Sequence, residues 1–100
     1  VSDLRVGDRV AYGGEGTGHG ECIMTGRNLV ARVPDAVPLD HACFATLGSI
    51  AMNAVRIAAP SLGESVVVLG LGLVGQLVAQ LARLQGATVI ALDLNAARVD

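Results

Sequence analysis

Short apolar runs between turn residues characterise the first third of this 100-residue chain. This pattern predicts strands at Arg9 to Tyr12, Cys22 to Met24 and Leu29 to Val33. Between the first two lies a loop, Gly13 to Gly20, with five glycines in eight positions. We therefore expect the first third to be rich in β-structure.

The middle third changes to helical spacing. Asp40 is expected to cap a helix that begins at His41. From Thr46 to Ala59 apolar residues recur every three or four positions, which predicts a second helix. Its apolar positions are Leu47, Ile50, Ala51, Ala54, Val55 and Ala58. The segment Pro60 to Glu64 breaks the pattern.

The last third predicts strand, helix and strand in succession. A β-branched run at Ser65 to Leu69 is followed by a helix and then by an apolar strand at Thr88 to Leu92. Gly86 fits the residue just past the helix end. Because the second strand is almost wholly apolar, we expect a parallel strand covered on both faces. The helical stripe comprises Leu73, Val74, Leu77, Val78, Leu81 and Ala82.

The sequence GLGLVG, with Gly70, Gly72 and Gly75 in G-x-G-x-x-G spacing, joins this first strand to the helix. Each glycine has a physical role in dinucleotide binding. Gly70 permits the tight turn, Gly72 lets the backbone approach a pyrophosphate, and Gly75 lets the helix lie close to the strand. The helix N-terminus would then offer N–H donors and a positive dipole end to the phosphates.

An acid follows the second strand at the position that such a site requires. Asp93 lies 18 residues after Gly75, where its carboxylate can accept hydrogen bonds from the hydroxyls of an adenosine ribose. Two other interpretations of this stretch are open. The glycines could serve packing alone, or the uncharged stretch between Glu64 and Arg83 could span a membrane. The interrupting glycines and glutamines and the β-branched start argue against a span.

Composition narrows the possible functions. Hydrophobic residues make up 52% of the chain and charged residues 16%, which describes a buried, well-packed chain. The net charge is −2 and the arginines are scattered, so no nucleic-acid face is predicted. Cys22 and Cys43 lack C-x-x-C spacing and no signal peptide is evident, which favours the cytoplasm. Cys22 is expected to be a small buried hydrophobe.

Both ends suggest a part of a longer protein. The chain lacks an initiator Met and closes on NAARVD, which resembles the first turns of a helix. Only β-α-β of a Rossmann half is present, and a two-stranded sheet buries little apolar surface. The predicted class is α/β, with part of a Rossmann fold and its parallel sheet.

The order GDRV, GHGECI, NLVARVPDAVPLDHACFATLGSIAMNAV and GESVVVLGLGLVGQ resembles the medium-chain dehydrogenase/reductase superfamily over essentially the whole chain. This superfamily includes zinc alcohol dehydrogenases and zinc-free quinone reductases, and one stretch also resembles a subgroup fused to a second oxidoreductase domain. The resemblance implies the C-terminal end of a GroES-like β domain at residues 1–33. It implies a helical crossover at 34–62 and the first part of a Rossmann domain at 63–100.

The resemblance also assigns cofactor-binding positions. The motif residues are Gly70, Leu71, Gly72, Leu73, Val74 and Gly75. Asp93 takes the ribose-binding position, which implies NAD over NADP because a carboxylate repels the 2′-phosphate. Arg98 falls where relatives often carry a basic residue over the ribose, although a solvated helix residue explains it equally. Thr46 and Ser49 would lie towards the nicotinamide, where ordinary helix packing is the alternative.

The same resemblance makes a zinc site doubtful. The third catalytic ligand would align at Ala45 or Thr46, neither of which is a good zinc ligand, and Cys43 lies too early in the chain. No four-cysteine lobe follows GDRV, so no structural zinc is expected. The H-x-E of His19 and Glu21 lacks a partner cysteine pair. No metal site is therefore predicted.

The leading hypothesis is part of an NAD-dependent oxidoreductase that transfers hydride between nicotinamide and a small alcohol, carbonyl or enone. The part alone is not expected to be active, and no residue can be assigned to proton transfer. A non-catalytic dinucleotide sensor and an S-adenosylmethionine-dependent methyltransferase are the alternatives. A small-molecule substrate and a homo-oligomer are expected, with no nucleic acid or membrane as partner.

Overall fold

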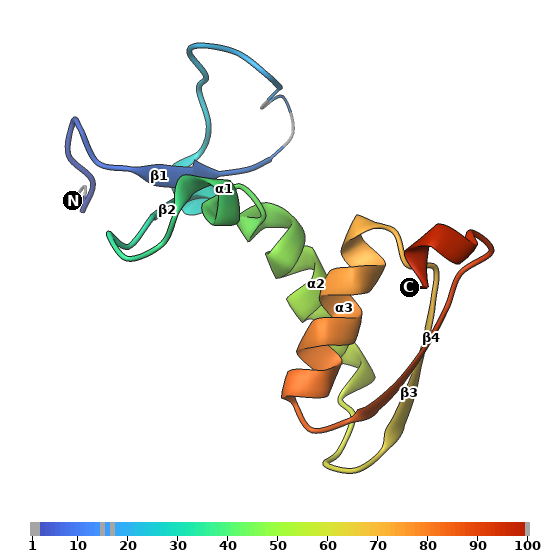
Figure 1. Cartoon of the computed structure of the whole chain (residues 1–100). Coiled ribbons are helices and arrows are strands. Elements are labelled where there is room, and N and C mark those ends of the chain that lie inside the picture. The colour runs from blue at the N-terminus through green and yellow to red at the C-terminus, as the bar shows by residue number, and fades with distance from the viewer. Residues whose placement is uncertain (1–2, 15, 17, 100) are drawn as a thin grey trace. The chain divides into compact units, whose positions relative to one another are not determined.

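The computed structural model describes residues 3–14, 16 and 18–99 of the chain (Figure 1). It divides into two compact units, residues 1–46 and residues 47–100. The second unit contains the glycine motif and the acid that follows it.

The first unit is built on a short antiparallel strand pair. β1 (Val10–Tyr12) pairs with β2 (Val30–Arg32), and Ala11 lies opposite Ala31. A 3-10 turn, η1 (Arg27–Leu29), leads into β2. Two of the three strands predicted for this region are therefore confirmed. A short helix, α1 (Leu39–Ala42), follows β2.

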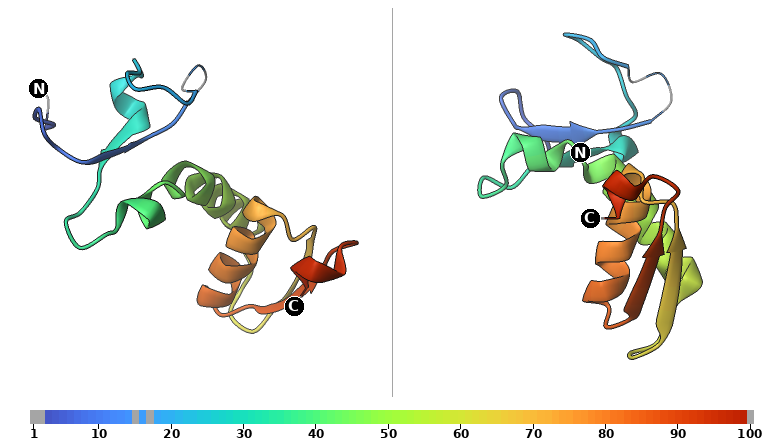
Figure 2. Two further views of the ribbon diagram at one scale, coloured as in Figure 1. Left: turned by 45° about the horizontal axis from the view of Figure 1, so that its top comes forward. Right: turned by 45° about the vertical axis from the view of Figure 1, so that its right-hand side comes forward.

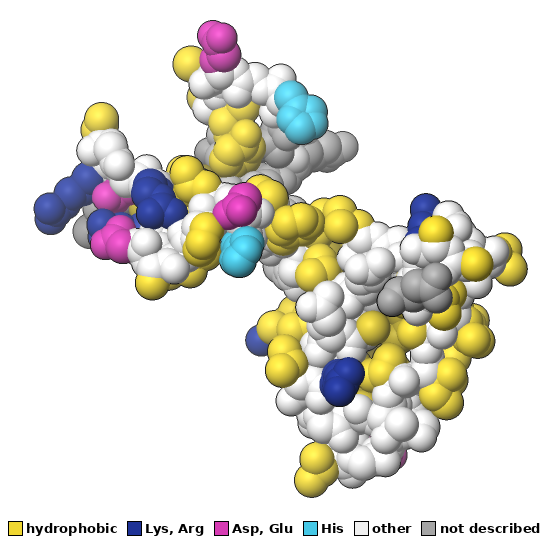
Figure 3. All heavy atoms as spheres, viewed as in Figure 1, with side chains coloured by type: hydrophobic (Ala, Val, Ile, Leu, Met, Phe, Trp, Pro, Cys, Tyr) yellow, Lys and Arg dark blue, Asp and Glu magenta, His cyan; other side chains and the backbone are white. Residues whose placement is uncertain are grey.

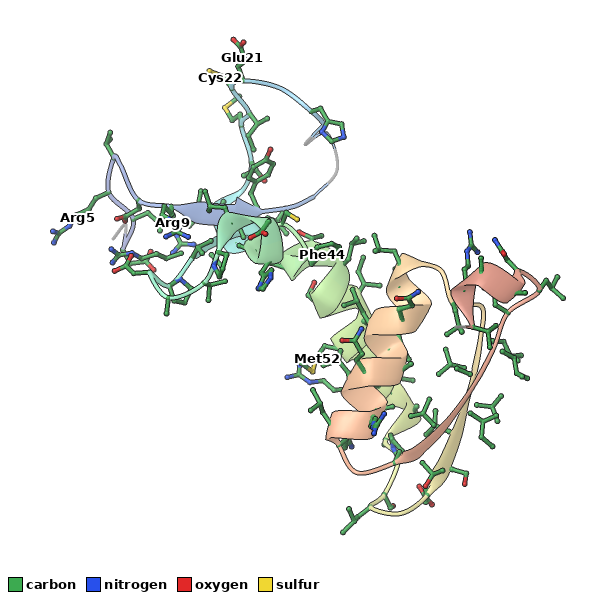
Figure 4. All side chains as sticks on the ribbon, viewed as in Figure 1. Arg5, Arg9, Glu21, Cys22, Phe44 and Met52 are labelled. Carbon is green, nitrogen blue, oxygen red and sulfur yellow. The ribbon has the colours of Figure 1, made fainter. Side chains whose placement is uncertain are left out.

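Three predictions for the first unit are wrong. Residues 22–24 form no strand, since they lie in the long loop between β1 and β2 without a pairing partner. Cys22 is exposed, near the far end of that loop in Figure 4, and is no buried hydrophobe. α1 begins at Leu39 with Pro38 as its N-cap, so Asp40 lies inside the helix and its side chain accepts from His41 N–H at 3.0 Å.

The second unit contains a β-α-β arrangement, as the pattern predicted. α2 (Ala45–Ala58), whose first two residues belong to the first unit, leads through a loop to β3 (Ser65–Leu69). α3 (Leu73–Leu84) then connects β3 to β4 (Thr88–Leu92), and a 3-10 turn, η2 (Ala96–Arg98), follows. β3 and β4 are parallel, with Val67 opposite Ile90. Gly86 adopts a φ of +96° just past α3, which confirms its predicted position.

One face of the β3–β4 pair carries the core, and α3 lies along the pair (Figure 2). The buried residues Val55, Ala82 and Ala87 form its centre. Partly buried residues packed against them are Val66, Val78, Leu81 and Val89. Since α2 supplies Val55 and α3 supplies Ala82, both predicted apolar stripes contribute to this core.

The opposite face of the strand pair is open in the described part of the chain, so the prediction of cover on both faces is wrong here. Leu69 is 77% exposed and Leu92 53%, because successive side chains on a strand point to opposite faces. Figure 3 shows many hydrophobic side chains at the surface of this unit. The prediction of a generally buried chain is also wrong, because this strand face and other large hydrophobic side chains are exposed.

No helix among the described residues has both the length and the apolar character needed to cross a membrane.

Candidate dinucleotide site

Parallel pairing brings the glycine turn and the acid to one edge of the sheet. Leu69 and Leu92, the last residues of β3 and β4, lie opposite each other. Gly70 and Asp93 follow them directly, and Gly70 N–H donates to the Leu92 carbonyl at 2.7 Å. Ligands of open α/β sheets bind outside the carboxyl ends of the strands, which is this edge.

The glycines of the motif have three different local environments. Gly70 has a φ of +91°, a left-handed conformation that confirms the tight turn. A Cβ added at Gly75 would lie 1.9 Å from the Gly70 carbonyl oxygen, so the predicted close approach of α3 is confirmed. A Cβ at Gly72 would meet no described atom within 4 Å. The fold itself therefore gives no steric reason for glycine at position 72.

The Asp93 carboxylate holds the two loops together. Its Oδ2 accepts from Leu71 N–H at 2.6 Å, and its Oδ1 accepts from Asn95 N–H at 2.7 Å. Arg98 Nη1 lies 3.5 Å from Asp93 Oδ2, and the acid side chain is only 8% exposed. The Asn95 and Leu71 N–H donors, with the nearby Arg98 charge, lower the Asp93 pKa from its usual 3.8.

The remaining motif residues lie around this turn. Leu71 is buried at 7% exposure, which anchors the turn in the fold. Leu73, the first residue of α3, is 55% exposed, although the helical stripe placed it in the core. Val74 is partly buried. The N-cap of α3 is Gly72, which has no side chain to cap the first N–H groups of the helix.

Two residues that contact the ends of these loops were missed at the level of sequence. Asn95 donates its N–H to Asp93, and its side chain accepts from Ala97 N–H at 3.1 Å. Gln76 Nε2 donates to the Leu71 carbonyl at 3.3 Å. The D-x-N spacing of Asp93 and Asn95 is typical of a turn closed by an acidic side chain and could have indicated the first contact. A glutamine on an exposed helix position carries no comparable signal.

A hollow of about 810 Å³ lies beside the acid. Its apolar lining includes Leu69, Leu92 and Leu94, and its polar lining includes Asp93 and Arg98. Apolar walls with a few convergent polar groups are typical of small-molecule sites. The carboxylate can accept hydrogen bonds from hydroxyl groups, and the first turn of α3 can donate to an anion.

Comparison with known proteins finds plant alcohol dehydrogenases among similar sequences. Alcohol dehydrogenase 1 of Oryza sativa subsp. indica is 40% identical over 74 residues, which cover 71% of this chain and 20% of that protein. Alcohol dehydrogenase class-P of Arabidopsis thaliana is 39% identical over 74 residues, with the same shares. Alcohol dehydrogenase 1 of Solanum tuberosum is 40% identical over 74 residues. No protein-family model matches the chain.

The chain belongs to the medium-chain dehydrogenase/reductase superfamily. It spans about a fifth of the length of these curated relatives.

Ala45 and Thr46 are the positions expected to align with the third zinc ligand of other superfamily members. Thr46 donates its hydroxyl to the Tyr12 carbonyl at 3.1 Å, and Ala45 has no ligating atom. Cys43 lies between α1 and α2, and its thiol donates to the Asp40 carbonyl at 2.9 Å. Within residues 3–14, 16 and 18–99, no group of three or more His, Cys, Asp or Glu could hold a metal ion.

Proposed function

We propose that the chain supplies the adenosine and pyrophosphate part of an NAD site in an oxidoreductase. The substrate would be a small alcohol, carbonyl or enone. The observation that carries this proposal is the Asp93 carboxylate held 2.6 Å from Leu71 N, at the carboxyl ends of two parallel strands. Relatives named alcohol dehydrogenase support the reaction class.

The residues present fit such a cofactor. The open space at the Gly72 Cβ position leaves room for a phosphate to approach the backbone. The first turn of α3 would donate N–H groups to the pyrophosphate, and Asp93 would accept from the ribose hydroxyls. The hollow beside Leu94 and Arg98 offers an apolar wall and a cation for the rest of the adenosine. Gly70 and Gly75 serve the turn that holds these groups in place.

When bound, the nicotinamide would supply the hydride-accepting carbon for alcohol oxidation. The described residues of this chain would bind and orient the adenosine end, and none is assigned to proton transfer. We also propose a domain assignment for the chain. Residues 63–100 would begin a Rossmann domain, residues 34–62 would cross between domains, and residues 1–33 would end a GroES-like domain.

NAD is preferred over NADP in this proposal because of the Asp93 charge. A 2′-phosphate placed at the ribose would meet the carboxylate that the diol would otherwise bind. Arg98 lies 3.5 Å from Asp93 Oδ2 and offsets part of that charge. We therefore expect a preference for NAD that depends on both side chains. Catalytic zinc has no place in the proposal.

The test is a fluorescence titration of the full-length protein and its Asp93→Ala variant with NADH and NADPH. We expect NADH to bind more tightly, and Asp93→Ala to weaken NADH binding about tenfold or more, because charge-assisted hydrogen bonds are lost. Asp35→Ala, which removes an exposed acid of the first unit, is the matched control. It should bind NADH like the unchanged protein.

Failure of both cofactors to bind would overturn the proposal and bring the methyltransferase forward. S-adenosylmethionine would then be titrated in the same way. NADH binding without turnover across a panel of small alcohols and carbonyls would favour the sensing module. The homo-oligomer and the cytoplasmic location remain predictions, which gel filtration and cell fractionation of the full-length protein would test.

A further inference from the structure

Two successive peptide units of the glycine turn, Gly70–Leu71 and Leu71–Gly72, are each held in place by contacts with other residues. Asp93 accepts from Leu71 N–H, and the carbonyl of the same unit, from Gly70, lies against Gly75. In the next unit, the Leu71 carbonyl accepts from Gln76 Nε2 at 3.3 Å. Gln76 lies in the first turn of α3, and its own N–H donates to the Gly72 carbonyl at 2.9 Å.

The second contact fixes the direction of an N–H group. A peptide unit is planar and trans, so its C=O and N–H point in opposite directions. Holding the Leu71 carbonyl towards Gln76 therefore keeps the N–H of Gly72 on the other side of that unit. Gly72 has open space where a Cβ would stand, and rotation about its neighbouring bonds is easy for glycine. The Gln76 contact restricts that freedom.

We propose that Gln76 is a positioning residue for the dinucleotide. Its side chain orients the Leu71–Gly72 peptide so that the Gly72 N–H faces the pyrophosphate before the ligand arrives. This inference rests on the proposed NAD site and adds to it a residue outside the glycine spacing. Preorganisation of this kind raises affinity because the ordering cost is met before binding.

The test measures binding of ADP-ribose, which carries the ribose and pyrophosphate without a reactive nicotinamide. Gln76→Met keeps the length of the side chain and removes the donor. We expect Gln76→Met in the full-length protein to weaken ADP-ribose binding about three- to tenfold, the range of one net hydrogen bond. Adenosine, which lacks phosphate, should bind unchanged, and thermal unfolding should remain a single cooperative transition.

Gln80 provides the matched control. It lies one helical turn further along α3, away from the glycine turn, and is exposed like Gln76. Gln80→Met should bind ADP-ribose normally. Equal affinities for the unchanged protein and Gln76→Met would overturn the inference and leave the NAD site standing. Weakened adenosine binding or loss of the cooperative unfolding transition in Gln76→Met would also overturn it, since either result indicates general damage.

A charge variant gives an independent readout. In Gln76→Glu the side chain at neutral pH can only accept, so ADP-ribose binding should fall. Below about pH 4.3 the introduced carboxyl is protonated and can donate again, so affinity relative to the unchanged protein should recover. Gln76→Met should show no such recovery, and a deficit in Gln76→Glu that persists in acid would count against the inference. Failure of the unchanged protein to bind ADP-ribose would overturn the NAD site itself.

Discussion

A Cβ atom added at Gly75 would lie 1.9 Å from the carbonyl oxygen of Gly70. Gly75 lies in the first turn of α3 and Gly70 in the turn after β3, and the contact would be with the Gly70 backbone, which cannot rotate away as a long side chain could. The carbonyl carbon of Gly70 would also be only 3.0 Å away. The start of α3 and the turn after β3 therefore pack with no room for a methyl group.

Gly75→Ala is expected to lower the free energy of unfolding by about 1–3 kcal/mol, the usual cost of overpacking. Urea unfolding of the full-length protein measures this change. Gly48→Ala is the control, because Gly48 lies inside α2 and a Cβ there would meet nothing within 4 Å. That variant should gain about 0.5–1 kcal/mol from helix propensity. An unchanged midpoint for Gly75→Ala would contradict the packing geometry.

Gly72→Ala should separate binding from stability. Gly72 has a φ of −66°, which alanine adopts readily, and no described neighbour would meet its Cβ. The unfolding midpoint should therefore stay close to that of the unchanged protein. NADH affinity should fall about tenfold, since the methyl group would stand where the pyrophosphate approaches the backbone. Tight NADH binding by Gly72→Ala would argue against this placement of the phosphates.

The lowered Asp93 pKa predicts a loss of stability in acid. In the folded protein the N–H groups of Asn95 and Leu71, and then Arg98, stabilise the charged carboxylate of Asp93. In the unfolded state the pKa of this carboxyl has its usual value of 3.8. The carboxylate therefore contributes fully above pH 3.8, and the contribution disappears as pH falls through the lower folded value. The difference in unfolding free energy between the unchanged protein and Asp93→Asn should be constant above about pH 5 and shrink below about pH 4.

Asp35→Asn serves as the control for that pH series, since Asp35 is an exposed acid of the first unit. The change in the Asp93→Asn difference is compared with this variant, which leaves the hydrogen bonds of Asp93 in place. Asp3, whose pKa is also lowered, chiefly by its hydrogen bond with Arg27, remains in every variant and cancels from the differences. A difference for Asp93→Asn that stays flat down to about pH 2 would show that its hydrogen bonds do not favour the charged form.

Coenzyme preference should respond to both members of the Asp93–Arg98 pair. Asp93→Asn removes the negative charge and leaves the Arg98 guanidinium to meet a 2′-phosphate. The ratio of NADPH to NADH affinity should rise about tenfold or more, the effect of one charge-assisted contact. Adding Arg98→Ala should abolish most of this rise. If the double variant kept the full rise, Arg98 would have no part in the preference.

Local pattern was enough to locate the second unit's elements and its turn. β3 and β4 have the bounds that their apolar runs predicted, because a continuous β-branched or apolar run bounded by a charged residue or a glycine leaves few alternatives. Gly70 and Gly86 have the positive φ angles expected of them. These features depend on the conformational preferences of neighbouring residues, which the sequence states directly.

Local pattern failed where a partner was required. Residues 22–24 have the composition of a strand but find no strand to pair with. Asp40 is a good capping residue, yet α1 already begins at Leu39, and the extended residue Pro38, whose ring fixes φ, is its N-cap. Burial of both faces of β4 requires packing layers on both sides of the strand pair, and the described residues cover only one face.

The sequence by itself determined that a glycine turn and an acid follow two apolar strands, because spacing and residue type express those features. Only the tertiary structure decided that Asp93 accepts from Leu71 N–H, that Arg98 shares its carboxylate, and that Gln76 donates to the Leu71 carbonyl. Parallel pairing of β3 and β4 creates the contact between Asp93 and Leu71, because it brings two residues that are 22 positions apart to one edge of the sheet. The directions in which the Arg98 and Gln76 side chains turn depend on the path of the folded backbone, which no local pattern specifies.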